Sequence, residues 1–120
     1  MNDVLLVGAG GFLGASARYL LGKYINRKWN GDFPLGTFVI NIIGSFLLGL
    51  LVFYPAVAGL FTIEMSLGVG IGFLGAFTTF STLEYETLVL LEKGKATTAL
   101  LYVLGSFIIG FLAVWVCLWL

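Results

Sequence analysis

The stretch GAFTTFST, from Gly75 to Thr82, contains four hydroxyl side chains within a long apolar segment. Three further glycines precede it, at positions 68, 70 and 72. A glycine in a helix interior costs about 1 kcal/mol relative to alanine, so the segment is poorly suited to one uninterrupted helix. The alternative is a continuous helix whose threonines bond back to their own turn. We predict the interruption.

The composition of the chain is that of an integral membrane protein. Of its 120 residues, 60% are hydrophobic and only 10% are charged, whereas about a quarter of residues are charged in soluble domains. The net charge of zero provides no basic surface for nucleic acid. Histidine is absent and Cys117 is the only cysteine, which excludes disulfides, thiol–histidine catalysis and most transition-metal sites. We therefore expect no enzymatic activity.

The charged residues divide the chain into four apolar segments, each long enough for the about 20 helical residues that cross a bilayer. These segments lie at Val4–Gly22, between Pro34 and Pro55, from Glu64 to about Glu92, and after Lys95. Main chain can leave a helix at membrane depth only where it is buried in protein or lines a cavity. The sequence predicts a single all-α domain, 1–120, with four transmembrane helices and a third helix broken in mid-membrane.

Basic residues are confined to one side of this predicted bundle. With four spans, the first and third connections share a side, which carries Lys23, Arg27, Lys28, Lys93 and Lys95. The side with the two termini carries no lysine or arginine. The positive-inside rule places the basic connections in the cytoplasm and the termini outside.

Glycines at positions 8, 10, 11 and 14 of the first span raise a separate possibility, the opening of a dinucleotide-binding fold. That motif needs a βαβ unit, and Leu13 stands where its third glycine belongs. We predict instead that these glycines allow two helices to pack closely.

Two predicted helices carry polar residues four positions apart, which places them on one helix face. The residues are Thr37, Asn41 and Ser45 in the second span, and Thr98, Tyr102 and Ser106 in the fourth. Interhelical hydrogen bonding and the lining of a pore both explain such a face. No carboxylate lies inside the first, second or fourth span. Hydroxyl, amide and aromatic ring-edge donors suit a small hard anion rather than a cation.

Three motifs resemble the fluoride-channel family (Fluc, CrcB-type), and the resemblance extends over the whole chain. GGFLGASARY, from Gly10, is similar to the family's first-helix pattern, with Arg18 as its structural arginine. GTFVINIIGS, from Gly36, is similar to the second-helix pattern, with Asn41 as its asparagine. GAFTTFST is similar to the broken third helix of the family.

The resemblance implies an antiparallel, dual-topology dimer with two fluoride pathways and a structural, untransported sodium ion (Na+) at its centre. The main-chain carbonyls of Gly75 and Thr78 from each subunit would hold the sodium. The fluoride pathway would include Asn41, Phe80, Tyr102, Ser106, Thr37, Thr79 and Ser81. The implied function is passive export of cytoplasmic fluoride. The protein would be a multi-pass protein of the plasma membrane, in contact with membrane lipid.

The chain departs from the family pattern at two positions. Leu83 stands where the pattern has a second phenylalanine, and Gly110 stands where the polar face of the fourth helix usually continues with a hydroxyl. Together with the one-sided charge, these departures predict a subunit that pairs with an oppositely oriented paralogue. A homodimer is the alternative.

Two other functions fit a four-span chain. A small-multidrug-type exporter needs a carboxylate within the first span, but Asp3 lies at the very terminus. A non-transporting membrane subunit would assemble through its glycine-rich helix faces. Glu84 and Glu86 follow the hydroxyl cluster and would lie either at a vestibule or, more commonly, at the solvated end of a span.

Overall fold

The structure is a computed structural model that describes residues 2–54, 59 and 62–120. Its elements are α1 (Asn2–Lys28), α2 (Leu35–Phe53), α4 (Ile63–Ser66), η1 (Leu67–Leu74), α5 (Gly75–Phe77), α6 (Phe80–Glu92) and α7 (Ala96–Cys117). Four helical segments are long and apolar enough to cross a membrane: Asp3–Lys28, Leu35–Phe53, Glu64–Glu92 and Ala96–Cys117. Within the described residues, the prediction of an all-α chain with four such segments is confirmed. The predicted end of the first span at Gly22 is wrong, because α1 continues through the basic residues to Lys28. Pro34 directly precedes α2, whereas the predicted boundary at Pro55 lies outside the described residues.

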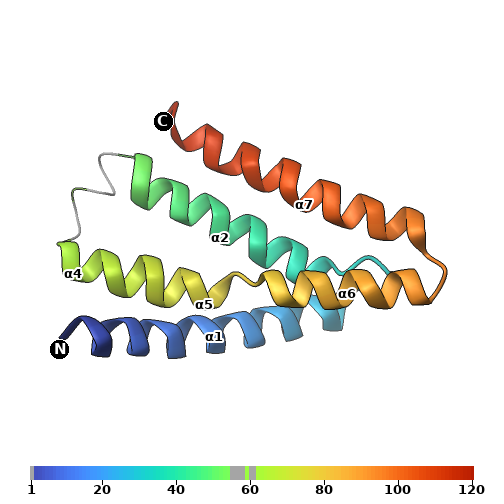
Figure 1. Ribbon diagram of the computed structural model, residues 1–120, viewed down its shortest axis with the longest axis horizontal. Helices are drawn as coiled ribbons and strands as arrows, with labels where there is room; N and C mark the ends of the chain where they lie inside the picture. Colours follow the sequence, from blue (N-terminus) through green and yellow to red (C-terminus); the bar gives the residue numbers. More distant parts are fainter. Residues whose placement is uncertain (1, 55–58, 60–61) are drawn as a thin grey trace.

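The four segments alternate in direction, so that both termini lie at one end of the bundle (Figure 1). At the other end lie the connection from α1 to α2 and the connection from α6 to α7. An ion pair between Asp32 and Lys95 joins these two connections. The Lys95 ammonium donates a hydrogen bond to the Asp32 carboxylate and lowers the pKa of that carboxyl below its ordinary value.

Helix α1 packs against the third segment through glycines (Figure 1). A Cβ atom added at Gly10 would overlap the carbonyl oxygen of Gly68, and one added at Gly14 would overlap the carbonyl oxygen of Phe73. By contrast, Gly8 on the same helix has nothing within 4 Å of such an atom. Small residues let main chains approach this closely in membrane helix pairs. Gly10 and Gly14 therefore serve helix packing, as predicted, whereas Gly8 and Gly11 do not make a close contact of this kind.

The third segment changes its helical geometry along its length. Element η1 is a π-helix, and the amide of Gly75 donates to the carbonyls of Gly70 and Gly72 at its end. One α-helical turn follows, and then Thr78 (φ −81°, ψ 151°) and Thr79 (φ −148°, ψ 120°) are extended. Helix α6 begins directly after them. Short π-helical segments are rare and often lie beside functional sites.

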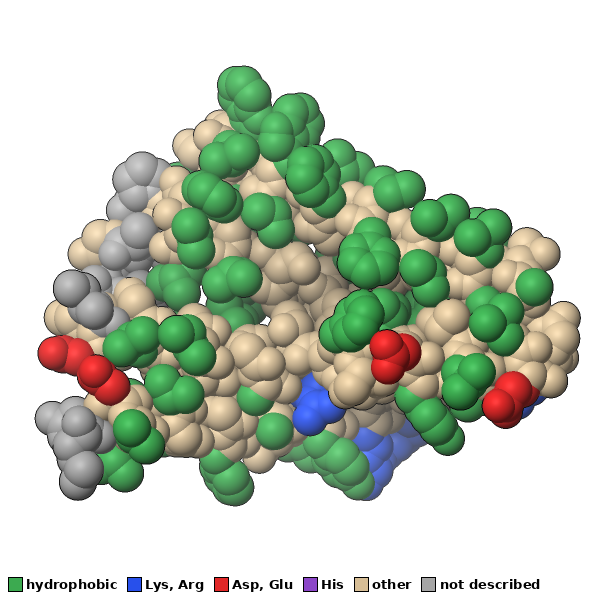
Figure 2. Space-filling view, viewed as in Figure 1, with side chains coloured by type: hydrophobic (Ala, Val, Ile, Leu, Met, Phe, Trp, Pro, Cys, Tyr) green, Lys and Arg blue, Asp and Glu red, His purple; other side chains and the backbone are tan. Residues whose placement is uncertain are grey.

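One cluster of buried residues forms a small core between α6 and α7. This core cluster consists of Leu83, Leu90, Ala99 and Tyr102, with Phe33 and Phe38 packed against it. Many large apolar side chains elsewhere are exposed, and they cover much of the face seen in Figure 2. An apolar surface of this extent suits contact with lipid or with another protein chain.

We expect Gly14→Ala to destabilise the fold, because the new methyl group would overlap main chain that cannot move aside as a side chain can. Overpacking of this kind costs roughly 1–3 kcal/mol. The thermal unfolding midpoint of the purified protein in detergent measures the effect. Gly8→Ala is the matched control and should leave the midpoint unchanged or slightly raised. Equal midpoints for the two variants would contradict the close α1–η1 packing.

Candidate functional site

The extended residues of the third segment are bonded to α2 through one amide side chain. The Asn41 Nδ2 donates to the carbonyl oxygen of Thr79 at 3.1 Å, and the Asn41 Oδ1 accepts from the amide of Thr79 at 2.9 Å. In a continuous α-helix, the amide of Thr79 would instead bond to the carbonyl of Gly75. The Asn41 side chain therefore accepts the hydrogen bond that the Thr79 amide would otherwise donate to the Gly75 carbonyl.

A second diversion occurs at the start of α6. The amide of Thr82 donates to the Thr79 Oγ1 at 3.3 Å, which makes Thr79 the N-cap of this helix. In a continuous helix that amide would bond to the carbonyl of Thr78. The carbonyls of Gly75 and Thr78 are the two that were predicted to bind sodium. They are also the two carbonyls whose helical donors, the amides of Thr79 and Thr82, are bonded to side chains instead.

A cavity of about 310 Å³ opens beside these residues, between α2, the third segment and α7. Six of the predicted site residues line it: Asn41, Gly75, Thr78, Thr79, Phe80 and Ser106. The remaining lining residues are Gly44, Ser45, Leu48, Gly70, Leu74, Leu83 and Phe107. As far as the described residues go, the lining contains no charged side chain.

Three lining residues have donor or ring-edge groups that no bond within the described residues uses. The Ser106 Oγ is buried and has no hydrogen-bond partner within the described part of the chain. The Phe80 ring is 64% exposed at the first position of α6. The Asn41 Nδ2 also carries a second hydrogen beyond the one bonded to Thr79.

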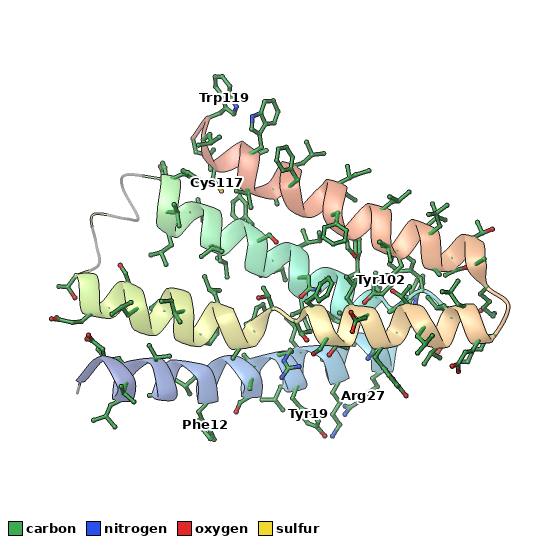
Figure 3. All side chains as sticks on the ribbon, viewed as in Figure 1. Phe12, Tyr19, Arg27, Tyr102, Cys117 and Trp119 are labelled. Carbon is green, nitrogen blue, oxygen red and sulfur yellow. The ribbon has the colours of Figure 1, made fainter. Side chains whose placement is uncertain are left out.

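Three predicted pathway residues lie beside the cavity rather than in its lining. Tyr102 is fully buried, and its hydroxyl donates to the Glu86 Oε1 at 3.1 Å; Figure 3 labels this tyrosine in the interior of the bundle. Thr37 lies next to the same hydroxyl. Ser81 is exposed, with its Oγ 3.3 Å from the Thr79 Oγ1. Glu86 is partly exposed and lines a hollow of about 350 Å³ together with Asp32 and Lys93, at the connection end of the bundle.

Arg18 is only partly exposed on α1 and does not line the cavity. Its Nε is buried, without a hydrogen-bond partner among the residues that the structure describes. Its assignment as a structural residue stays a prediction.

Comparison with known proteins places the chain in a family. The model of the CrcB-like protein family (Camphor Resistance, CrcB) matches residues 5–118. The chain belongs to the CrcB family. A fluoride-specific ion channel FluC of Oceanobacillus iheyensis is 50% identical over 92% of this chain and 84% of that protein. One of Campylobacter lari is 45% identical over 97% of this chain and 94% of that protein.

The CrcB relatives are named as ion channels, not as enzymes. The resemblance predicted from the three motifs is thus confirmed. Together with the four membrane-length helices, membership of the CrcB family makes this chain a multi-pass membrane protein.

The two departures from the CrcB pattern have different surroundings. Leu83 is 6% exposed and belongs to the core cluster as well as to the cavity lining. A Cβ atom at Gly110 would lie 3.5 Å from the Ser45 Oγ, which is an ordinary contact distance, so the packing of α7 against α2 does not require a glycine there.

Ser45 and Phe107 are among the seven lining residues that the predicted site did not include. Ser45 continues the polar face of Thr37 and Asn41 and could have been included on that signal. Phe107 follows Ser106 directly, but nothing in the sequence pattern distinguishes it from a lipid-facing aromatic residue.

We expect Asn41→Ala to weaken both folding and ion movement, because it leaves the amide and the carbonyl of Thr79 without partners. An unsatisfied buried polar group costs about 1–3 kcal/mol. The thermal midpoint measures the first effect. Asn41→Asp is the informative second variant, since its carboxylate still accepts from the Thr79 amide but cannot donate to the Thr79 carbonyl. An unchanged midpoint for Asn41→Ala would contradict a stabilising role for the two bonds to Thr79.

Proposed function

We propose that this chain is a subunit of a fluoride-selective channel that exports cytoplasmic fluoride passively across the plasma membrane. The observation that carries the proposal is the cavity beside Thr79, in which uncharged donors gather without a charged side chain among the described lining residues. Relatives up to 50% identical are named fluoride-specific ion channels. We infer the same conducted ion for this chain.

The donors at the cavity match the needs of a small anion. An anion that leaves water loses hydrogen bonds, and it must regain them from the protein. The Ser106 hydroxyl and the second hydrogen of the Asn41 amide are donors of this kind. The Phe80 ring can add a weakly positive edge. Because none of these groups carries a full charge, the anion is held weakly enough to leave again.

The proposed outward direction of transport follows from the acid–base chemistry of hydrogen fluoride. Hydrogen fluoride crosses a membrane as a neutral acid and ionises in a less acidic cytoplasm. The accumulated fluoride then moves outward through the channel down its own gradient, without coupling to another ion.

In purified liposomes loaded with potassium fluoride or potassium chloride, we expect rapid efflux of fluoride and none of chloride once valinomycin removes the electrical barrier. An ion-selective electrode measures both. Phe80→Ala and Ser106→Ala should each slow fluoride efflux by tenfold or more, on the order of 1.4 kcal/mol in barrier height. Thr97→Ala, at an exposed hydroxyl of α7 outside the cavity lining, is the control. Chloride efflux as fast as fluoride efflux would refute the selectivity, and proton-coupled movement of an organic cation would favour an exporter.

The carbonyls of Gly75 and Thr78 suit a structural sodium ion. Hard cations take oxygen ligands, and carbonyls freed where a membrane helix unwinds are a known source of them. Both carbonyls have lost their helical donors to the Asn41 side chain and to the Thr79 hydroxyl. In the described part of the chain, no three His, Cys, Asp or Glu side chains gather at one place. A sodium site here would therefore use main-chain oxygens.

We expect removal of sodium to weaken the assembled channel, because the two carbonyls of each subunit would then face each other without a cation. Reconstitution with N-methylglucamine in place of sodium should lower fluoride efflux, and returning sodium should restore it. A second test is to measure fluoride efflux of Asn41→Asp as sodium is added. We expect the sodium concentration needed for efflux to differ from that of the unmodified chain. Identical efflux in strictly sodium-free and sodium-containing vesicles would refute the site.

Two carbonyls make an incomplete cation site, so the proposal includes a second, antiparallel subunit. Gly75 and Phe80 are exposed on this chain and would be covered by that subunit. The one-sided basic charge, Leu83 and Gly110 support pairing with an oppositely oriented paralogue. Moorella thermoacetica has two fluoride-specific ion channels of this family, FluC 1 and FluC 2, which are 46% and 44% identical to this chain.

We expect a reporter fused after Leu120 to be found on the outer face of the membrane only, because the basic residues oppose the reverse insertion. A pair of reporters active on opposite sides measures this, such as alkaline phosphatase and green fluorescent protein. Moving charge to the other end, by Lys93→Gln and Lys95→Gln with two lysines added near the N-terminus, should make the signals more equal. Equal signals from the unmodified chain would indicate dual insertion and a homodimer.

A further inference from the structure

The face of α1 that points away from the third segment has a shallow groove. Phe12, Ala15, Ser16, Tyr19 and Leu20 line this open hollow of about 520 Å³. Phe12 and Tyr19 are 73% and 65% exposed, and Figure 3 shows both projecting outward from this helix. The small side chains of Ala15 and Ser16 form the floor between the larger ones. The groove is mostly apolar and follows the helix from Phe12 to Leu20.

Cations continue the same face beyond the groove. Lys23 and Arg27 follow Tyr19 at four-residue spacing, which keeps them on one side of the helix. The Lys23 Nζ lies 5.9 Å from the centroid of the Tyr19 ring, and Arg27 projects from α1 on the same side as Tyr19 in Figure 3. The basic side chains visible in Figure 2 gather along this edge of the bundle.

No carboxylate on α1 offsets this charge. The only acidic residue of the helix is Asp3, at its opposite end. The next acidic residue along the chain is Asp32, whose carboxylate is paired with Lys95. Lys23 and Arg27 therefore present an anion-binding group directly beside an apolar groove.

We propose that this face binds one anionic phospholipid, with an acyl chain in the groove and the phosphate at Lys23 and Arg27. The dimensions agree with this occupant. From Phe12 to Lys23 the helix rises about 16 Å, at about 1.5 Å per residue, and half of a bilayer core is about 15 Å. Clusters of lysine and arginine at the cytoplasmic end of a span attract anionic lipid. A choline headgroup would bring its own cation to a face of α1 that carries no carboxylate between Val4 and Lys28.

The lipid site does not depend on the proposed transport of fluoride. It uses the outer face of α1, whereas the cavity lies between α2, the third segment and α7. Its test therefore measures lipid binding, and a failure of fluoride transport would leave the outcome of that test unchanged.

The experiment is native mass spectrometry of the delipidated full chain in detergent, titrated with phosphatidylglycerol or with phosphatidylcholine of the same chain length. We expect phosphatidylglycerol to bind more tightly. Lys23→Gln and Arg27→Gln should each weaken it about fivefold, as expected for the loss of one cation at a lipid surface. Both residues are exposed, so the variants should fold. Lys93→Gln, at the same end of the bundle but away from the groove, is the matched control and should change binding by less than about twofold.

A second variant tests the groove itself. Ala15→Phe fills the floor of the hollow and should weaken the binding of phosphatidylglycerol while leaving Lys23 and Arg27 in place. Equal losses in Lys93→Gln and Lys23→Gln would overturn the proposal in favour of diffuse surface charge. Displacement of the lipid by inorganic phosphate at similar concentration would show that the groove contributes nothing. A change of oligomeric state in Ala15→Phe with unaltered lipid binding would assign the groove to a second copy of the chain.

Discussion

The two hydrogen bonds between the Asn41 amide and the main chain of Thr79 are the interaction on which the site depends. Two extended residues inside an apolar bundle leave main-chain groups without their helical partners, and each such group is costly when it stays unpaired. Asn41 satisfies both polar groups of one of these residues from a neighbouring helix. The Thr79 hydroxyl then caps α6 and allows a regular helix to resume at once.

The same bonds have a consequence for the residues on either side. Because the amides of Thr79 and Thr82 are bonded to side chains, the carbonyls of Gly75 and Thr78 are released from helical bonding. The cavity opens at this place, and Ser106 of α7 adds a hydroxyl without a partner in the described part of the chain. An interruption that would be unfavourable alone thus provides both main-chain oxygens and side-chain donors at one depth of the bundle.

Packing of the first helix positions this interruption. Gly10 and Gly14 bring α1 against the main chain of η1, immediately before the extended residues. On the opposite side of the cavity, Gly44 approaches Thr78, and a Cβ atom there would overlap the threonine side chain. The third segment therefore packs against glycines on both sides, with Gly10 and Gly14 of α1 on one side and Gly44 of α2 on the other. This arrangement restrains residues whose own helical bonds are missing, and it keeps the cavity between α2 and α7.

The sequence alone determined the class of the protein, the number of spans, most helix ends and the residue types of the site, because these depend on local composition and on helical periodicity. The four-residue spacing of Thr37, Asn41 and Ser45 places them on one face, and the motifs identify the family. Only the tertiary structure decided which groups meet: that Asn41 bonds to Thr79, that Glu86 accepts from Tyr102, and that Phe107 lines the cavity. Spacing within one helix carries no information on how that helix is rotated and shifted against its neighbours. That arrangement follows from packing at glycines far apart in the chain. It also follows from the π-helical element η1, whose position along the third segment cannot be derived from any one stretch of sequence.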